Sequence, residues 1–128
     1  MTRGVGELLD AARAQILRFT PREALERASA GALLVDIRPR AQRDEHGGVP
    51  GALCIERNVL EWRLDPSCEY RIPEATDHAR CVIVLCQQGY ASSLAAASLH
   101  ALGYSQVGDV IEGFDGWREA GLPTTLRW

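Results

Sequence analysis

Lysine is absent from this chain of 128 residues, and all fourteen basic side chains are arginine. A lysine Schiff base, a lysine general base and the lysine of a phosphate-binding P-loop are therefore excluded. The arginines are scattered and the net charge is −3, so there is no basic block that would follow a phosphate backbone. Because only 6% of the residues are aromatic and able to stack on bases, nucleic acid is not an expected partner.

Long apolar runs are also missing. Charged side chains at Glu7, Asp10, Arg13 and Arg18 interrupt the N-terminal region, which is unlike a signal peptide. Elsewhere no segment approaches the roughly 20 apolar residues of a membrane span. We therefore expect one globular domain in the cytoplasm, with no membrane partner, where structural disulfides are rare.

The four cysteines, Cys54, Cys68, Cys81 and Cys86, are compatible with two disulfides, a metal site or one reactive thiol. A zinc site needs close ligand pairs, and Cys81 with Cys86 is the one close pair in the sequence. Their odd separation sends them to opposite faces of a strand, and no two histidines have metal-ligand spacing. We therefore expect neither a metal nor another cofactor.

The N-terminal region has apolar residues at near-helical spacing over residues 7–19, which predicts an amphipathic helix. We interpret residues 1–19 as a helical extension that packs on its own domain or joins two copies, giving a monomer or a weak homodimer. The following Thr20-Pro21-Arg22-Glu23 has the pattern of a capping box with proline at the first helical position. It predicts a second helix that ends near Gly31.

Four short apolar runs, at residues 32–37, 52–55, 81–85 and 107–111, predict buried strands. Helices are expected over residues 90–102 and 114–120, ended by Gly103 and by Gly121 with Pro123. Strands that alternate with helices indicate an α/β domain with a mainly parallel sheet. In such sheets chemistry takes place at the carboxyl ends of the strands.

Cys86 lies at such a strand end, between the third predicted strand and an alanine-rich helix. The loop that follows can curl so that its backbone N–H groups point inward, and the next helix adds the positive end of its dipole. This arrangement binds an anion and favours a thiolate. A buried structural cysteine stays an open alternative. The amides expected to bind substrate are those of Gln87, Gln88, Gly89, Tyr90, Ala91 and Ser92.

Four stretches, in the expected order, resemble the rhodanese-like domain family. Asp36-x-Arg38 after the capping box is similar to its first strand end, and residues 49–52 (VPGA) to its proline turn. Cys86-x-x-Gly89 resembles its catalytic loop, and residues 111–123 resemble its closing Gly-x-x-x-Trp-x-x-Ala-Gly-x-Pro signature. The resemblance implies a rhodanese-like domain over residues 20–128, with helices on both faces of the sheet.

The resemblance also implies a sulfurtransferase. A Cys86 persulfide would carry sulfane sulfur from thiosulfate or a persulfide donor to a thiol or cyanide acceptor. Sulfurtransferases of this family have a six-residue loop counted from the cysteine, as residues 86–91 do, whereas related dual-specificity phosphatases have seven. Ala91 replaces a common loop arginine and Gly48 a common histidine, so a weakly active or non-catalytic binding module is the alternative.

The missing loop arginine directs attention to other arginines. Arg57 follows the second predicted strand and is our candidate for orienting an anion, with Arg38 as a weaker candidate that more readily ties the strand end to its neighbours. Cys54 is expected in the core, with a resolving role for Cys86 as the alternative. Trp62 and Trp117 are expected to be core or packing residues.

Overall fold

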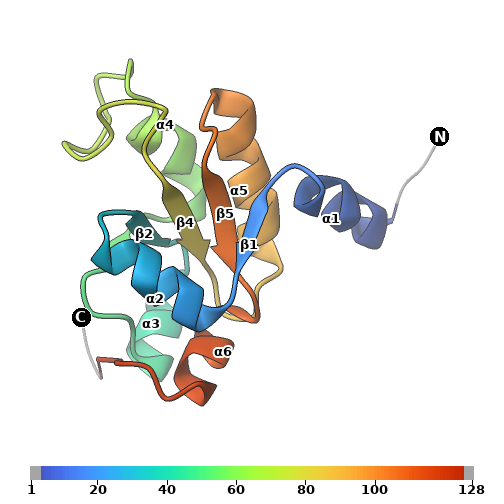
Figure 1. The fold of residues 1–128 in the computed structure, drawn as a ribbon, viewed down its shortest axis with the longest axis vertical. Helices are drawn as coiled ribbons and strands as arrows, with labels where there is room; N and C mark the ends of the chain where they lie inside the picture. The colour runs from blue at the N-terminus through green and yellow to red at the C-terminus, as the bar shows by residue number, and fades with distance from the viewer. Residues whose placement is uncertain (1–3, 126–128) are drawn as a thin grey trace.

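Five short strands form one sheet in the computed structural model, which describes residues 4–125 (Figure 1). The strands are β1 (Leu17–Phe19), β2 (Leu33–Asp36), β3 (Leu53–Cys54), β4 (Val82–Leu85) and β5 (Val107–Val110). They lie in the order β1-β5-β4-β2-β3, and all the pairs are parallel. The predicted α/β class is confirmed, and β4, which leads into Cys86, is the central strand.

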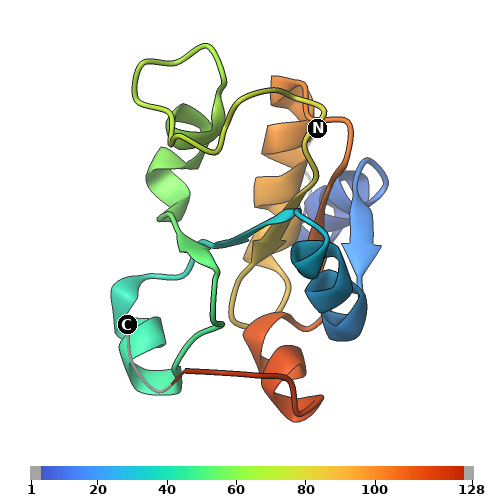
Figure 2. The same ribbon diagram turned by 60° about the vertical axis from the view of Figure 1, so that its left-hand side comes forward.

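Helices cover both faces of this sheet, as Figures 1 and 2 show. They are α1 (Val5–Arg13), α2 (Pro21–Ser29), α3 (Arg40–His46), a 3-10 turn η1 (Arg57–Val59), α4 (Leu60–Leu64), α5 (Ala91–Leu102) and α6 (Gly113–Glu119). Val82 and Val84 of β4 pack with α4 and α5, and Ile83 and Leu85 pack with α2 and α6. Because side chains alternate along a strand, one apolar run supplies both cores.

The predicted capping box of α2 is confirmed. The Thr20 hydroxyl accepts a hydrogen bond from the Glu23 backbone N–H at 3.2 Å, and the Glu23 carboxylate accepts one from the Thr20 N–H at 2.8 Å. These bonds satisfy two backbone donors at the helix start and fix the direction in which the chain leaves β1.

The prediction of one helix over residues 7–19 is wrong in its second half. Helix α1 ends at Arg13, and Leu17–Phe19 is strand β1 at the edge of the sheet beside β5. The backbone pairs closely here because Gly108 of β5 has no side chain; a Cβ there would collide with the Leu17 carbonyl. Sheet pairing therefore overrides the helical spacing, and α1 packs against α5 of its own domain.

Cys54, which was expected in the core, and Trp62, which was expected in the core or in packing contacts, are exposed instead. Cys54 lies on the two-residue edge strand β3 and points outward, whereas the next residue, Ile55, is buried. Trp62 is 57% exposed because α4 turns Leu60 and Leu64, four residues apart, toward the core. Trp117 is fully buried, as expected. Helices α3 and α4 were not anticipated from the sequence.

Over residues 4–125, none of the helices combines the length and apolar character needed to cross a membrane.

Candidate active site

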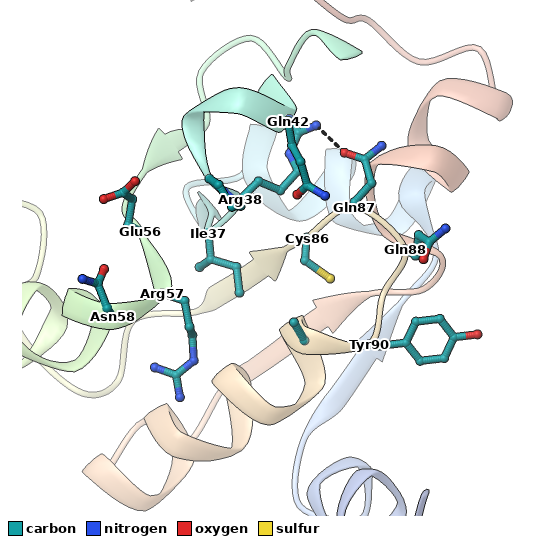
Figure 3. A pocket seen from close by; sticks show the side chains of 12 residues that line it. Ile37, Arg38, Gln42, Glu56, Arg57, Asn58, Cys86, Gln87, Gln88 and Tyr90 are labelled. Atoms are coloured by element: carbon teal, nitrogen blue, oxygen red, sulfur yellow. Dashed lines mark hydrogen bonds between the residues drawn. The ribbon is translucent and has the colours of Figure 1, made fainter. Parts of the chain in front are cut away.

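The carboxyl ends of β2, β3 and β4 meet at a pocket of about 590 Å³ (Figure 3). The lining residues that bear on its chemistry come from three segments of the chain, and they are Arg38, Glu56, Arg57, Cys86, Gln87 and Tyr90. The strand order explains the convergence, because parallel strands end at the same edge of the sheet. The sequence-based expectation that Cys86 and Arg57 share one rim is confirmed.

Cys86 is 7% exposed, and its Sγ is held by the backbone of the loop that follows it. The Gly89 N–H donates to Sγ at 3.2 Å and the Ser92 N–H donates at 3.3 Å. Ser92 is the second residue of α5, so the sulfur occupies the place of an N-cap acceptor at the positive end of a twelve-residue helix. Such donors stabilise an anionic sulfur more than a neutral thiol.

The loop is supported from below by the start of α6. The Phe114 N–H donates to the Cys86 carbonyl at 2.8 Å, and the Asp115 N–H donates to the Gln87 carbonyl at 3.0 Å. Gly113 has φ +57°, and a Cβ at this position would collide with the Cys86 carbonyl oxygen. The glycine therefore allows α6 to approach the loop closely.

Arg38 forms the inner wall of the pocket and is 1% exposed. Its guanidinium donates to the Asp36 carboxylate at 2.7 Å and to the Gly47 carbonyl at 2.9 Å, and it lies over the Phe114 ring. A further bond of 2.9 Å reaches the Gln87 side chain, as Figure 3 shows. These donors tie the end of β2 to the loop, which are contacts of the kind that the sequence analysis expected for Arg38.

The outer rim of the pocket is more exposed. Arg57 has a side chain that is 41% exposed and donates to both carboxylate oxygens of Glu61 at 3.0 Å. Glu56 is exposed beside it, and Tyr90 is 60% exposed. Figure 3 shows the Tyr90 ring directed away from Cys86, so it borders the pocket entrance without covering the sulfur.

One group near the site was missed by the sequence analysis. Asp109 of β5 is fully buried, and its Oδ2 accepts from the hydroxyls of Ser92 at 2.8 Å and Ser93 at 2.7 Å. Arg18 of β1 donates to Oδ1 at 3.0 Å. These residues are far apart in the sequence. The signal that could have indicated this group is Asp109 itself, because a charged residue within an apolar strand needs a buried partner.

The other cysteines have different surroundings from Cys86. Burial raises the pKa of the Cys81 thiol, and Arg27 opposes this. Partial desolvation also raises the pKa of the Cys54 thiol; Asp36 adds to the rise, whereas Arg43 and Arg38 oppose it. Cys54 and Cys86 are both free thiols. Exposure alone therefore does not make Cys54 the better nucleophile at neutral pH.

A sequence model of the rhodanese-like domain matches residues 20–120. The chain belongs to the rhodanese-like domain family. Thiosulfate sulfurtransferase GlpE of Haemophilus influenzae is 35% identical over 105 residues, which cover 82% of this chain and 90% of the relative. The same enzyme from Actinobacillus succinogenes is 34% identical over 82% of this chain and 86% of its own. These relatives confirm the predicted enzyme class, a sulfurtransferase of the rhodanese type.

Solved structures agree on the fold. A protein of unknown function from Rhodopseudomonas palustris, described as a possible tyrosine phosphatase, is 31% identical and has a TM-score of 0.87 over 97% of this chain and 96% of its own. The polysulfide-sulfur transferase of Wolinella succinogenes is 21% identical, with a TM-score of 0.69 over 92% of this chain and 84% of its own. At that identity, the second likeness supports the rhodanese-like fold only.

Proposed function

We propose that this rhodanese-like domain transfers sulfane sulfur from thiosulfate, or from a persulfide donor, to a thiol or cyanide through a persulfide on Cys86. The observation that carries the proposal is the position of the Cys86 Sγ. Cys86 lines a pocket, and its Sγ accepts hydrogen bonds from the backbone N–H groups of Gly89 and Ser92. The relatives named thiosulfate sulfurtransferase supply the donor class.

The first step is attack by the Cys86 thiolate on the outer sulfur of thiosulfate. The S–S bond of the donor breaks, sulfite leaves with its electron pair, and a Cys86 persulfide forms. In the second step, an acceptor thiolate or cyanide attacks the terminal sulfur and Cys86 leaves as a thiolate. Cys86 carries an anionic sulfur before and after each step, first as a thiolate, then as a persulfide and again as a thiolate. The inward-facing amides therefore stabilise a negative charge on this residue throughout the cycle.

The loop from Gln87 to Ser92 is proposed to bind the donor through its backbone amides, since no guanidinium occupies the Ala91 position. Arg57 is proposed to attract and orient the donor from the rim, where its partly exposed guanidinium is paired with Glu61. Arg38 is proposed to hold Gln87 in place. This division leaves one cation at the entrance and none in the loop itself.

Mass spectrometry of the intact protein after thiosulfate treatment tests the proposal. We expect the wild type to gain one sulfur atom, which a thiol acceptor then removes. Cys86→Ser should gain none, and Cys54→Ser is the matched control because it removes an exposed thiol and leaves the loop unchanged. A sulfur gain that is lost in Cys54→Ser but kept in Cys86→Ser would show that Cys54 carries the sulfur, and it would overturn the role proposed for Cys86.

Two further outcomes would overturn the proposal. Absence of any sulfur gain would favour a non-catalytic binding module, the alternative that Ala91 and Gly48 raise. Cys86-dependent hydrolysis of an aryl phosphate without sulfur gain would instead favour a phosphatase, as the description of the Rhodopseudomonas palustris protein suggests for that chain. Counted from Cys86, the loop has six residues and ends at Ala91, the first residue of α5. This length supports sulfur transfer over phosphate hydrolysis.

A further inference from the structure

Two arginines from the N-terminal region reach the outer side of the loop that holds Cys86. Arg13, the last residue of α1, donates to the Gly89 carbonyl at 2.8 Å and to the Ser93 hydroxyl at 3.0 Å. Arg18 of β1 donates to the same Gly89 carbonyl at 3.4 Å while it pairs with Asp109. Both arginines precede residues 20–120, the part of the chain that the family model matches.

The Gly89 carbonyl is the point at which these contacts act on the loop. A trans peptide plane holds its C=O and N–H groups in opposite directions, so fixing the Gly89 oxygen toward the arginines turns the Tyr90 N–H away from them. The Gly89 N–H on the other side of the same residue donates to Sγ at 3.2 Å. Gly89 has φ +87°, and a Cβ there would lie 2.8 Å from the Glu112 nitrogen. The loop thus depends on one glycine whose carbonyl is held from outside.

Ser92 and Ser93 connect the same contacts to the start of α5. Ser92 donates its N–H to Sγ at 3.3 Å and its hydroxyl to the buried Asp109 at 2.8 Å. Ser93 accepts from Arg13 and donates to Asp109 at 2.7 Å. Both residues that donate an N–H to Sγ are therefore fixed from the rear by a network that ends at Arg13 and Arg18.

We propose that Arg13 and Arg18 are positioning residues that, through the Gly89 carbonyl and Asp109, hold the loop amides in the geometry that stabilises an anionic Cys86 sulfur. The inference rests on the proposed role of Cys86 as a nucleophile. It assigns a function to the segment before the family-matched region: α1 and β1 complete the site from behind. The ring of Tyr90, 5.7 Å from the Arg13 guanidinium carbon, adds a cation–π contact at the same point.

Alkylation of Cys86 by iodoacetamide, followed by peptide mass spectrometry across a pH series, tests this role. In Arg13→Met, which keeps an unbranched stem but no donors, the pH at which alkylation reaches half its maximal rate should rise by about 0.5 to 1 unit. This is less than the roughly 1 to 2 units that a whole hydrogen bond to an anion is worth, because the amides that donate to Sγ are loosened and not removed. Arg22→Met, which removes an exposed arginine of α2, is the control and should match the wild type.

Arg13→Lys separates geometry from charge. A single ammonium cannot reproduce the planar donors that contact Gly89 and Ser93 together, so we expect it to recover less than half of the shift. Coincident profiles for Arg13→Met and the wild type, or complete recovery in Arg13→Lys, would overturn the proposal. The alkylation assay does not require sulfur transfer, so it stays decisive if thiosulfate proves not to load the protein.

Discussion

The inner wall and the outer rim of the Cys86 pocket each carry one arginine, and the two have opposite surroundings. Arg38 on the inner wall is buried and donates to Asp36, Gly47 and Gln87. Arg57 on the rim is 41% exposed and makes one ion pair, with Glu61. Arg38 uses its hydrogen-bond donors to hold the loop in place. Arg57 is accessible to solvent, so a substrate anion could replace Glu61 as its partner.

The difference in burial between the two arginines predicts which substitutions the site can tolerate. A buried charge that loses its partner has no water to replace it, so its removal disturbs the whole wall. An exposed ion pair competes with water and salt at all times, and its loss costs little stability. Substitutions on the inner wall should therefore act on folding, and those on the rim on substrate binding.

The largest effect is expected for Arg38→Met, which leaves the fully buried Asp36 carboxylate without its cation. We expect the free energy of unfolding to fall by about 3–5 kcal/mol in urea denaturation. Arg57→Met is the matched control and should lose less than about 1 kcal/mol. Equal losses in the two variants would break the distinction between wall and rim.

The contact between α6 and the loop predicts the next largest effect. Gly113→Ala would place a methyl group against the Cys86 carbonyl at a positive φ, and we expect a loss of about 3 kcal/mol together with weaker sulfur loading. Gly121→Ala has a similar φ of +75° but open space around it. It should lose about 1 kcal/mol and load sulfur normally, so similar behaviour of the two alanines would argue against a steric role for the contact.

On the rim, Arg57→Ala tests the proposed orientation of the donor. Because the guanidinium is partly exposed and screened by solvent, we expect the thiosulfate concentration for half-maximal sulfur loading to rise by about twofold to fivefold. The maximal loading rate should stay that of the wild type, since Arg57 does not contact Sγ through any of its hydrogen bonds. An unchanged dependence of sulfur loading on thiosulfate concentration would show that Arg57 does not help to bind the donor.

The central part of this site could be predicted from the sequence because its signals are local. Cys86 follows an apolar run and precedes a glycine and a helix start, all within a few positions. Asp36 and Arg38 are two residues apart at the end of an apolar run, which is why Arg38 was expected to tie the strand end to its neighbours; its ion pair with Asp36 was not predicted. The parallel sheet then brings Arg57 to the same edge without further information.

The support behind the loop could not be predicted in this way. Arg18 and Asp109 are 91 positions apart, and Arg13 and Gly89 are 76 apart. Their contacts depend on β1 joining the sheet beside β5, and residues 17–19 carry a pattern that also continues a helix. Ser92 and Ser93 look like ordinary members of an alanine-rich helix until the buried Asp109 is placed beneath them. Tertiary pairing, not local propensity, decides this half of the site.

The smallest expected effect concerns Glu61, the partner of the rim arginine. Partial burial opposes its ionisation, but a hydrogen bond from Ser98 and the charge of Arg57 outweigh this and hold the pKa of Glu61 below its usual value. A lowered folded-state pKa stabilises the fold above the unfolded-state pKa, and this stability is lost as the pH falls through the folded-state value. We therefore expect Glu61→Gln to be about 0.5 kcal/mol less stable than the wild type at about pH 6, and we expect this difference to vanish at about pH 3. Urea denaturation at the two pH values measures it, and a difference that persists in acid would mean that the pair contributes by packing and not by charge.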